Sequence, residues 1–270
     1  MIHLISYLEN SSINLQIMKN KYQVVVIENP CLAWDDMHVK DFFVKIAKLK
    51  IEGFQYEYGL NVMPLNAHDF FATHVVLCEV DNGELTPISA MKISKYSVCN
   101  FFAHSFPPMD LALQGGNSAL AKEIEDIVKQ ITQQGKEITY DASWTTRPDI
   151  RNSNLINRIS RIVFALWINY HLFNSIPNLI VSATLKVKTD KIFYATGCVP
   201  ISKDPYYKLI EVDNQDAMMF SCNRFSDMIL RNAERYQDLW DNRIEYGNPI
   251  PQIQIQIQNY ETYISRERTL

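Results

Sequence analysis

Residues 144–162 of this chain, WTTRPDIRNSNLINRISRI, decide how the rest of the sequence is interpreted. They connect a predicted strand over residues 137–145 to a predicted long helix over about residues 154–174, whose apolar residues recur at helical spacing. A β-branched run over residues 178–187 predicts the next strand. A strand, a loop, a long helix and a second strand in this order predict a parallel strand pair joined by a right-handed crossover.

Three arginines surround the predicted start of this helix: Arg147, Arg151 and Arg158. The backbone N–H groups of a helix N-terminus point outward, and the helix dipole favours an anion there. Because guanidinium groups pair well with phosphate, the stretch indicates a phosphate- or pyrophosphate-binding site. Surface salt bridges are the alternative role of these three side chains.

The rest of the chain predicts a mixed α/β fold, in which an Asn82–Gly83 turn is typical of a β-hairpin. The predicted elements are a strand over 22–28, a helix over 36–49, hairpin strands over 72–80 and 87–98, a helix over 118–134, a short helix over 189–196, strands over 208–212 and 218–221, and a charged helix over 225–243. Residues 53–69 are expected to form an irregular loop. The side chains expected on the solvent face of the first helix are Lys40, Lys45, Lys48 and Lys50.

The composition is that of an ordinary soluble protein and excludes several classes. With 47% hydrophobic and 21% charged residues, the 270-residue chain is neither disordered nor collagen-like. Its formal net charge of −4 argues against a dedicated DNA-binding protein, so no nucleic-acid partner is expected. The sequence shows no secretory signal and no apolar run long enough to span a bilayer. We therefore expect a cytoplasmic protein without an integral membrane segment.

The cysteine and histidine patterns indicate neither a disulfide framework nor a metal site. The five cysteines are scattered without a CxxC pair, which is typical of buried small side chains in a reducing compartment. The six histidines lack metal-ligand spacing, so no metal is expected. We expect a single domain over residues 1–270, with a strand and helix in 1–50, a core in 51–213, and a helix followed by a strand or tail in 214–270.

Residues 144–162 resemble the acyl-coenzyme-A-binding motif of the GCN5-related N-acetyltransferase (GNAT) superfamily. In that motif a strand ends in a Pro-containing turn, and an Arg/Gln-x-x-Gly-x-Gly/Ala loop starts a long helix. Here Pro148 lies in the turn and Arg151 at the Arg/Gln position. Asn154 and Ile156 occupy the two glycine positions, and the Ile156 side chain would narrow the approach of a pyrophosphate.

Residues 66–80, NAHDFFATHVVLCEV, are similar to a run that enters the hairpin in the acyl-carrier-protein-using branch of this fold. That branch includes acyl-homoserine-lactone synthases and N-acyl amino acid synthases. The likeness rests on Asp69, Phe70, Phe71 and His74. The resemblance implies that the acyl donor is an acyl-coenzyme A (acyl-CoA) or an acylated carrier protein (acyl-ACP).

The resemblance also implies the fold and the donor site. The implied fold is a mixed, mostly antiparallel central sheet with one splayed parallel strand pair and flanking helices. The pantetheine arm of the donor would lie between the splayed strands, where backbone groups of Ser143, Trp144 and Thr145 would polarise the thioester carbonyl. Trp144 is either a wall of the acyl pocket or a core residue. The residues implied in binding the donor phosphates are Arg147, Arg151, Asn152, Ser153 and Asn154.

Proton transfer in such a site needs an acid and a base. The resemblance implies Tyr194 as the acid that protonates the leaving thiolate, although Phe193 stands at the family's tyrosine position and Tyr194 one residue later. Asp141 or Glu79 is the candidate base for the acceptor amine. Each of these side chains has a structural alternative, as a hydrogen-bonded carboxylate or a packed aromatic ring. The amine would attack the thioester directly, without a covalent enzyme intermediate.

The sequence therefore predicts an acyltransferase that moves an acyl group from acyl-CoA or acyl-ACP to a small-molecule or protein amine. The alternative is a non-catalytic GNAT-like module for binding or assembly. The alternating Gln and Ile residues over 251–258 predict a strand that either closes the protein's own sheet or pairs with a second copy. The second alternative predicts a homodimer.

Overall fold

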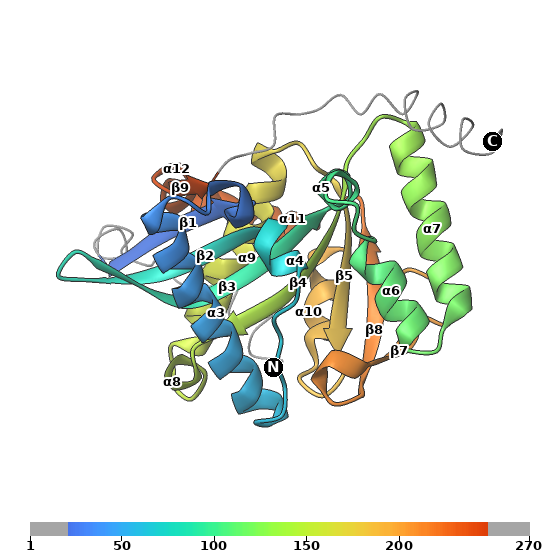
Figure 1. Ribbon diagram of the computed structural model, residues 1–270, viewed down its shortest axis with the longest axis horizontal. Coiled ribbons are helices and arrows are strands. Elements are labelled where there is room, and N and C mark those ends of the chain that lie inside the picture. Colours follow the sequence, from blue (N-terminus) through green and yellow to red (C-terminus); the bar gives the residue numbers. More distant parts are fainter. Residues whose placement is uncertain (1–20, 248–270) are drawn as a thin grey trace.

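The computed structural model describes residues 21–247, which form one large, mixed β-sheet with helices on both faces (Figure 1). The order of the strands across the sheet is β6-β8-β5-β4-β3-β2-β1-β9, and β7 pairs with β8. The strands are β1 Tyr22–Glu28, β2 Thr73–Asp81, β3 Glu84–Lys95, β4 Ile138–Thr146, β5 Asn178–Thr184, β6 Val199–Pro200, β7 Tyr206–Leu209, β8 Gln215–Cys222 and β9 Ile244–Gly247.

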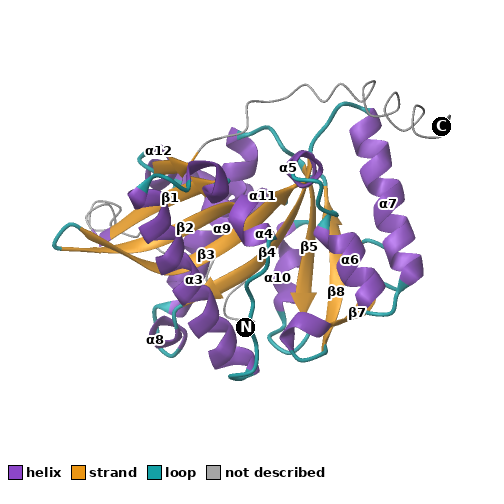
Figure 2. Cartoon of the chain, viewed as in Figure 1, coloured by secondary structure: helices purple, strands orange, loops and turns teal. Residues whose placement is uncertain are grey.

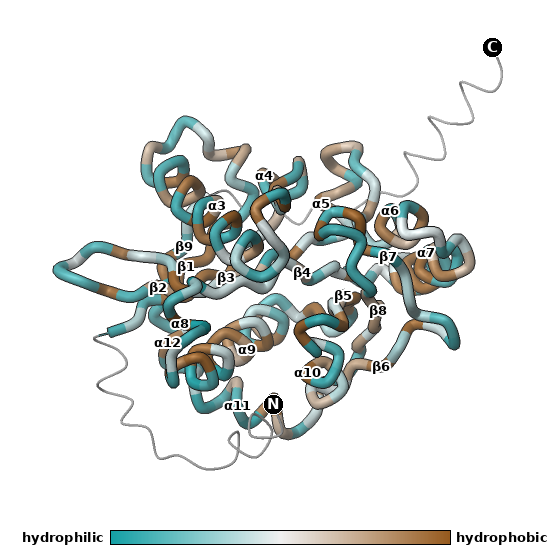
Figure 3. Tube along the Cα trace, turned by 90° about the horizontal axis from the view of Figure 1, so that it is seen from below, coloured by the Kyte–Doolittle hydropathy of each residue, from teal (hydrophilic) through white to brown (hydrophobic). Residues whose placement is uncertain are grey.

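The helices divide between the two faces of the sheet (Figure 3). One face carries α3, α4, α5, α6 and α7, and the opposite face carries α9, α10, α11 and α12. The helices are η1 Pro30–Ala33, α3 Met37–Tyr58, α4 His68–Phe71, α5 Tyr96–Phe101, α6 Pro107–Gln114, α7 Ser118–Gln133, α8 Pro148–Arg151, α9 Ile156–Phe173, α10 Thr189–Thr196, η2 Ile210–Val212, α11 Asp227–Arg235 and α12 Gln237–Asp241.

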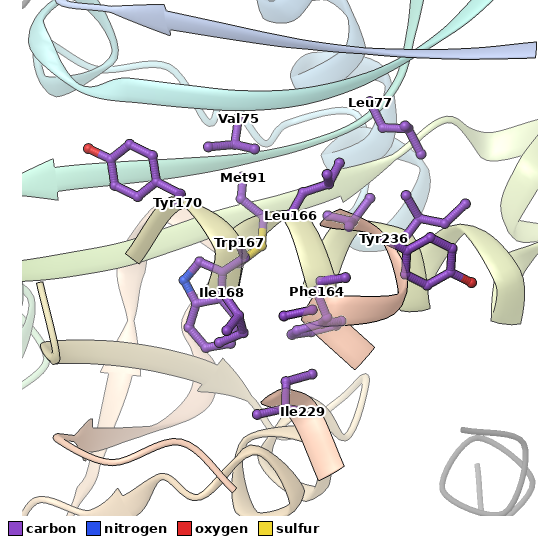
Figure 4. Close-up of a cluster of buried hydrophobic side chains, with 14 of the residues drawn as sticks. Val75, Leu77, Met91, Phe164, Leu166, Trp167, Ile168, Tyr170, Ile229 and Tyr236 are labelled. Carbon is purple, nitrogen blue, oxygen red and sulfur yellow. The ribbon is translucent and has the colours of Figure 1, made fainter. Parts of the chain in front are cut away.

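The central helix α9 organises the largest hydrophobic core (Figure 4). Every residue from 159 to 171 is buried, because the helix lies between the sheet and the outer helix α11. Side-chain amides join the two helices: Asn232 Nδ2 donates to the Arg161 carbonyl at 2.8 Å, and Asn169 Nδ2 donates to the Ala233 carbonyl at 3.0 Å. The apolar run that made α9 easy to predict is therefore explained by burial on nearly all sides.

The predicted fold class is confirmed. The pairs β1–β2, β2–β3, β3–β4 and β5–β8 are antiparallel, whereas β4 and β5, which flank α9 in the sequence, are parallel. The element order of a hairpin, the strand β4, the long helix α9, the strand β5, the helix α10 and the strand β8 is the order expected from the resemblance. A second parallel pair, β1–β9, was not predicted.

Several predicted boundaries are wrong. The first helix continues to Tyr58 instead of ending near residue 49, so residues 53–58 are helical and not part of a loop. The helix α6 was not predicted; the two prolines at its first positions are compatible with a helix start. The charged helix over 225–243 is two helices, α11 and α12, that meet at the buried Tyr236. The Gln–Ile stretch over 251–258 lies outside the described residues.

Gly53 accounts for the misplaced end of α3. A glycine suggests a helix end in a sequence, but here it lies inside the helix where α3 packs closely against β4. A Cβ atom at this position would lie 2.1 Å from Thr145 Oγ1 and 3.3 Å from the Thr146 carbonyl oxygen. The glycine is therefore required by the close approach of a helix to a strand.

Within residues 21–247, no helix is both long and apolar enough to cross a membrane.

Gly53→Ala tests this packing. Alanine in place of glycine inside an exposed helix normally stabilises the protein by roughly 0.5–1 kcal/mol. Here we expect the opposite sign, a loss of about 1–3 kcal/mol in the free energy of unfolding, because the new methyl group overlaps Thr145. Urea denaturation followed by circular dichroism measures the change. Adding Thr145→Ala to Gly53→Ala should recover part of the loss, and no recovery would contradict this explanation.

Candidate active site

The parallel strands β4 and β5 pair over only half of their length. Their register runs from Ile138 opposite Asn178 to Asp141 opposite Val181, and beyond this point the strands diverge (Figure 2). The cause lies within β4, which has a β-bulge against β3: two residues, Ser143 and Trp144, stand where β3 has one. Ser143 has a φ of 56°, an uncommon conformation for a residue with a side chain.

A cavity of about 540 Å³ opens through the gap between the two strands. On the side of α3 and α6 the lining includes the polar side chains of Tyr58, His68, Lys92, Tyr140 and Ser182 beside apolar ones such as Phe54 and Leu111, and we call this part the polar chamber. On the side of α9 and α10 its walls are mainly apolar, and we call this part the apolar chamber; its lining includes Trp144, Ile156, Val187, Ile192 and Phe193. The cavity therefore connects the two faces of the sheet.

The three arginines near the start of α9 point in different directions. Arg147 forms ion pairs with Asp149 at 2.6 Å and with Glu79 at 3.3 Å. The Arg158 guanidinium stands 6.0 Å from the ring centre of Tyr22. Of the three, Arg151 is the one that lines the cavity in the described part of the chain. The structure thus brings one arginine, and not a cluster of three, to the gap.

Arg151 and the loop that follows it contact the end of α3. Arg151 Nη1 pairs with Glu57 at 3.0 Å, and its Nε donates to the Thr146 carbonyl at 3.0 Å. The Tyr56 hydroxyl donates to Asn152 Oδ1 at 2.7 Å. The Ser153 hydroxyl donates to the Ile150 carbonyl at 2.8 Å.

The two glycine positions of the motif carry side chains in different surroundings. Asn154 is exposed, and Ile156 begins α9 and lines the cavity. The helix start therefore presents the sec-butyl side chain of Ile156 to the cavity beside its backbone N–H groups. This arrangement leaves less space for a phosphate than a glycine would.

The residues of the β4 bulge separate into cavity walls and core. Ser143 and Trp144 line the cavity, whereas Thr145 is buried against Gly53. The Trp144 ring packs edge-on against Phe164 at 4.7 Å. Its Nε1 is buried and has no hydrogen-bond partner among the described residues, so it is an unused donor in the wall of the cavity.

Asp141 is held at the last paired position of β4. Its Oδ2 accepts hydrogen bonds from Trp167 Nε1 at 2.6 Å and from His171 Nε2 at 2.7 Å, which ties β4 to α9. The other ring nitrogen of His171, Nδ1, faces the Ile176 carbonyl at 3.0 Å. Asp141 Oδ1 is buried without a hydrogen-bond partner among the described residues, and Asp141 is one of the residues that line the cavity.

Two of the predicted acid and base residues lie outside the cavity. Glu79 is paired with Arg147 and with Lys21, the latter at 3.5 Å. Tyr194 is half-exposed and packs edge-on against Phe220, whereas Phe193 is buried and lines the cavity. Consecutive helix residues differ in direction by ~100°, so the one-residue offset in the sequence sends the tyrosine away from the gap.

The sequence missed a buried cluster of charges beside the cavity. Lys50 was expected to face water, but it is 2% exposed and pairs with Asp69 at 2.5 Å. Lys92 pairs with the other oxygen of Asp69 at 3.3 Å. The weak sequence signal was Asp69, a carboxylate next to two phenylalanines, although nothing local shows that α3 brings Lys50 to it.

Burial sets the protonation of this cluster and of its histidine neighbours. Burial, reinforced by the charge of Lys92, lowers the pKa of Lys50 to about 7. Burial alone would raise the pKa of Asp69, but the charges of Lys92 and Lys50 outweigh it and hold that pKa well below its usual range. Burial also lowers the pKa values of His68 and His74 to about 4, so both rings are neutral at pH 7.

Within residues 21–247, no group of three His, Cys, Asp or Glu side chains is placed to hold a metal ion.

Comparison with known proteins finds similarity only among solved structures. No family model and no curated protein matches the chain. The CoA-dependent acyl-homoserine lactone synthase BjaI, solved with MTA, has a TM-score of 0.49 and 13% identity, and the match covers 85% of this chain and 95% of BjaI. The N-acyl amino acid synthase FeeM from uncultured soil microbes has a TM-score of 0.47 and 15% identity, and the match covers 76% of this chain and 90% of FeeM. The acyl-homoserine lactone synthase LasI has a TM-score of 0.46 and 14% identity, and the match covers 84% of this chain and 98% of LasI.

These likenesses concern the fold. The order of the elements and the parallel pair that opens beyond Asp141 and Val181 are those expected from the resemblance of residues 144–162 to the GNAT superfamily. A shared fold does not fix an activity, which depends on the residues of the cavity.

The neutral state of His74 predicts an acid-sensitive fold. The unfolded chain protonates this side chain near pH 6.5, whereas the folded protein does so only near pH 4. The unfolded state therefore binds more protons below pH 6.5, and stability should fall as the pH drops from 6.5 to 4, by about 3 kcal/mol from His74. Urea midpoints across this range measure the slope.

The control for this pH dependence is an exposed histidine. His74→Gln should make the slope shallower and leave the contribution of His68, while His38→Gln should leave the slope unchanged, because the His38 side chain is exposed. Equal slopes in the wild-type protein and His74→Gln would show that another group causes the acid sensitivity.

Proposed function

We propose that this protein transfers an acyl group from a thioester donor to an amine. The observation that carries the proposal is the end of the β4–β5 pairing at Asp141 and Val181, with a cavity of about 540 Å³ in the gap beyond. Backbone groups beyond the paired positions lie along this gap. A pantetheine arm is extended and carries two amides, so it can hydrogen-bond to such groups as an added strand does.

The donor is an acyl-CoA or an acyl-ACP. Arg151 is the cationic group at the gap that can bind a donor phosphate, in exchange for its contact with Glu57. The side chain of Ile156 restricts space at the helix start, which makes a carrier-protein or long-chain donor as compatible as acetyl-CoA. The apolar chamber is lined by Trp144 of β4, Ile156 of α9 and Phe193 of α10, and this lining suits an acyl chain.

The chemistry proceeds by direct attack. The amine nitrogen forms a bond to the thioester carbonyl carbon, and the carbon–sulfur bond breaks to release a thiolate. The groups that line the cavity and can accept the amine proton are Asp141, through Oδ1, and the neutral imidazole of His68. Burial raises the pKa values of Tyr58 and Tyr140, so both phenols stay protonated and can donate to the leaving sulfur.

The acceptor is a small-molecule or protein amine that reaches the polar chamber, and cytoplasmic localisation remains our expectation for such a reaction. A non-catalytic binding or assembly module is the second candidate. It is favoured by the position of Tyr194 and Glu79 outside the cavity and by the engagement of Arg151 with Glu57. The two candidates differ in whether a thioester enters the gap and reacts there.

Ala142→Phe tests whether the gap binds the donor. Ala142 follows the last paired residue of β4 and lines the cavity, so a phenyl ring there would fill the space between the strands. For the wild-type protein, ligand at a hundred times its dissociation constant should add about 2.7 kcal/mol of stability. We expect CoA, acetyl-CoA or octanoyl-CoA to raise the melting temperature of the wild-type protein and to have no effect on Ala142→Phe.

The matched control is Ala119→Phe, which makes the same change at an exposed position of α7. It should keep the full thermal shift. Release of free thiol from octanoyl-CoA in the presence of an amine mixture measures transfer itself. Binding without thiol release would favour the module, and no thermal shift with any of the three ligands or with an acyl-ACP would contradict a donor site.

Arg151 and Glu57 provide a test with opposite signs. If Arg151 binds a donor phosphate, Arg151→Ala should weaken CoA binding about tenfold, through the loss of a charge-assisted hydrogen bond. Glu57→Gln should strengthen binding, because it removes the carboxylate that competes for the guanidinium. Isothermal titration calorimetry with CoA measures both. Weaker binding in both variants would instead indicate that the ion pair only supports the fold.

A further inference from the structure

With both lysines protonated, the cluster of Lys50, Asp69 and Lys92 has one more positive than negative charge. Its three side chains are 3%, 1% and 7% exposed, so each is removed from bulk water. Asp69 gives one oxygen to each lysine. Among the described carboxylates, Asp69 is the only one within ion-pair distance of either ammonium group. Burying an uncompensated charge is costly, so a second anion is missing from this cluster.

The groups around the cluster do not supply that anion. His68 on α4 and His74 on β2 are neutral at pH 7, because burial lowers both pKa values to about 4. Four carboxylates line the cavity, and all have other partners: Glu57 pairs with Arg151, and Asp141 accepts hydrogen bonds from Trp167 and His171. Asp110 accepts a hydrogen bond from Ser105, and Glu211, which is exposed, accepts one from Asn66 at 3.3 Å.

Lys92 is the member of the cluster that reaches the cavity. It lies on β3 directly opposite Ala142 of β4, the residue at which β4 begins to leave β5. Its Nζ contacts Asp69 Oδ2 at 3.3 Å and Asn66 Oδ1 at 3.5 Å. An ammonium group has three N–H donors, so one remains for a ligand in the polar chamber.

We propose that Lys92 binds the carboxylate of a small organic ligand in the polar chamber, with Lys50 and Asp69 behind it. The identity of this ligand rests on the proposed function: it is the amine acceptor, which then carries a carboxylate as well as its amine. The carboxylate completes the charge balance of the cluster, and the neighbouring gap holds the donor thioester. The binding step itself does not depend on acyl transfer.

The cost of burying the unbalanced charge of this cluster supports a role for it in binding. A lysine that adds an unbalanced buried charge lowers the stability of the fold, and such residues are retained where function needs them. The pKa of Lys50, lowered to about 7 by burial and by Lys92, reflects the same repulsion. A bound carboxylate would relieve it.

Benzoate and benzamide are the probes for this site, since they have the same shape and differ in charge. Isothermal titration calorimetry in a buffer free of carboxylate and phosphate should show benzoate binding at least tenfold more tightly than benzamide. Lys92→Met keeps the length of the side chain without its charge and should weaken benzoate binding at least tenfold. Lys208→Met changes a lysine whose side chain is 55% exposed and should leave binding unchanged. Equal binding of the two probes, or benzoate binding that survives in Lys92→Met, would overturn the proposal.

Thermal stability gives a second, independent readout. Lys92→Met leaves one lysine and one carboxylate, so its melting temperature should equal or exceed that of the wild-type protein. Asp69→Asn leaves two buried ammonium groups without a counter-ion and should melt several degrees lower. If Lys92→Met is as unstable as Asp69→Asn, the charge balance is different and the proposal fails.

The proposed acyl transfer and the carboxylate site can fail separately. Lys92→Met should keep the thermal shift produced by CoA, because the polar contacts of Lys92 Nζ are with Asn66 and Asp69. A CoA shift without charge-dependent benzoate binding would remove only the carboxylate site. Charge-dependent benzoate binding without any donor shift would remove only acyl transfer.

Discussion

The structure depends on the point at which β4 stops pairing with β5. Asp141 is the last paired residue, and its carboxylate is fixed by Trp167 and His171 of the central helix. The bulge at Ser143 immediately follows and turns the strand away. One strand is thus anchored to α9 at the position where it leaves its neighbour, so the gap is part of the fold and needs no ligand to form it.

The last turn of α3 holds the two sides of this gap together. On the β4 side, Glu57 pairs with Arg151 at 3.0 Å. On the β5 side, the Tyr58 hydroxyl shares a hydrogen bond with Thr184 at 2.7 Å, and Lys186 donates to the Glu57 carbonyl at 2.5 Å. The close contact of Gly53 with Thr145 sets the position of the helix. A single helix therefore fixes the width of the opening, and a donor phosphate that takes Arg151 from Glu57 would act on the same contact.

The cavity joins two environments that a transfer reaction needs to keep apart. Trp144, Ile156 and Phe193 give one side an apolar surface, whereas His68 and Lys92 give the other a polar one. The sheet separates them everywhere except at the gap. An apolar chain and a polar acceptor can then meet only where the backbone of β4 is free to hydrogen-bond, which is the geometry that direct attack on a thioester requires.

The sequence alone determined the parts of this protein that local patterns specify. The apolar period of α9, the β-branched runs of β4 and β5 and the Asn82–Gly83 turn were sufficient to predict the parallel pair and the hairpin. These features depend on residues close together in the chain. Their side chains share one face at fixed spacing, so periodicity reveals them.

Which side chains meet in the cavity depends on the tertiary structure. Lys50 has the spacing of a surface lysine, yet α3 carries it to Asp69 in the interior. Arg147 and Arg151, four residues apart, bind carboxylates from different elements, and a difference of one residue directs Phe193 inward and Tyr194 outward. The reason is physical: the direction and the partners of a side chain depend on strand register, helix rotation and contacts between distant segments, none of which leaves a local pattern in the sequence.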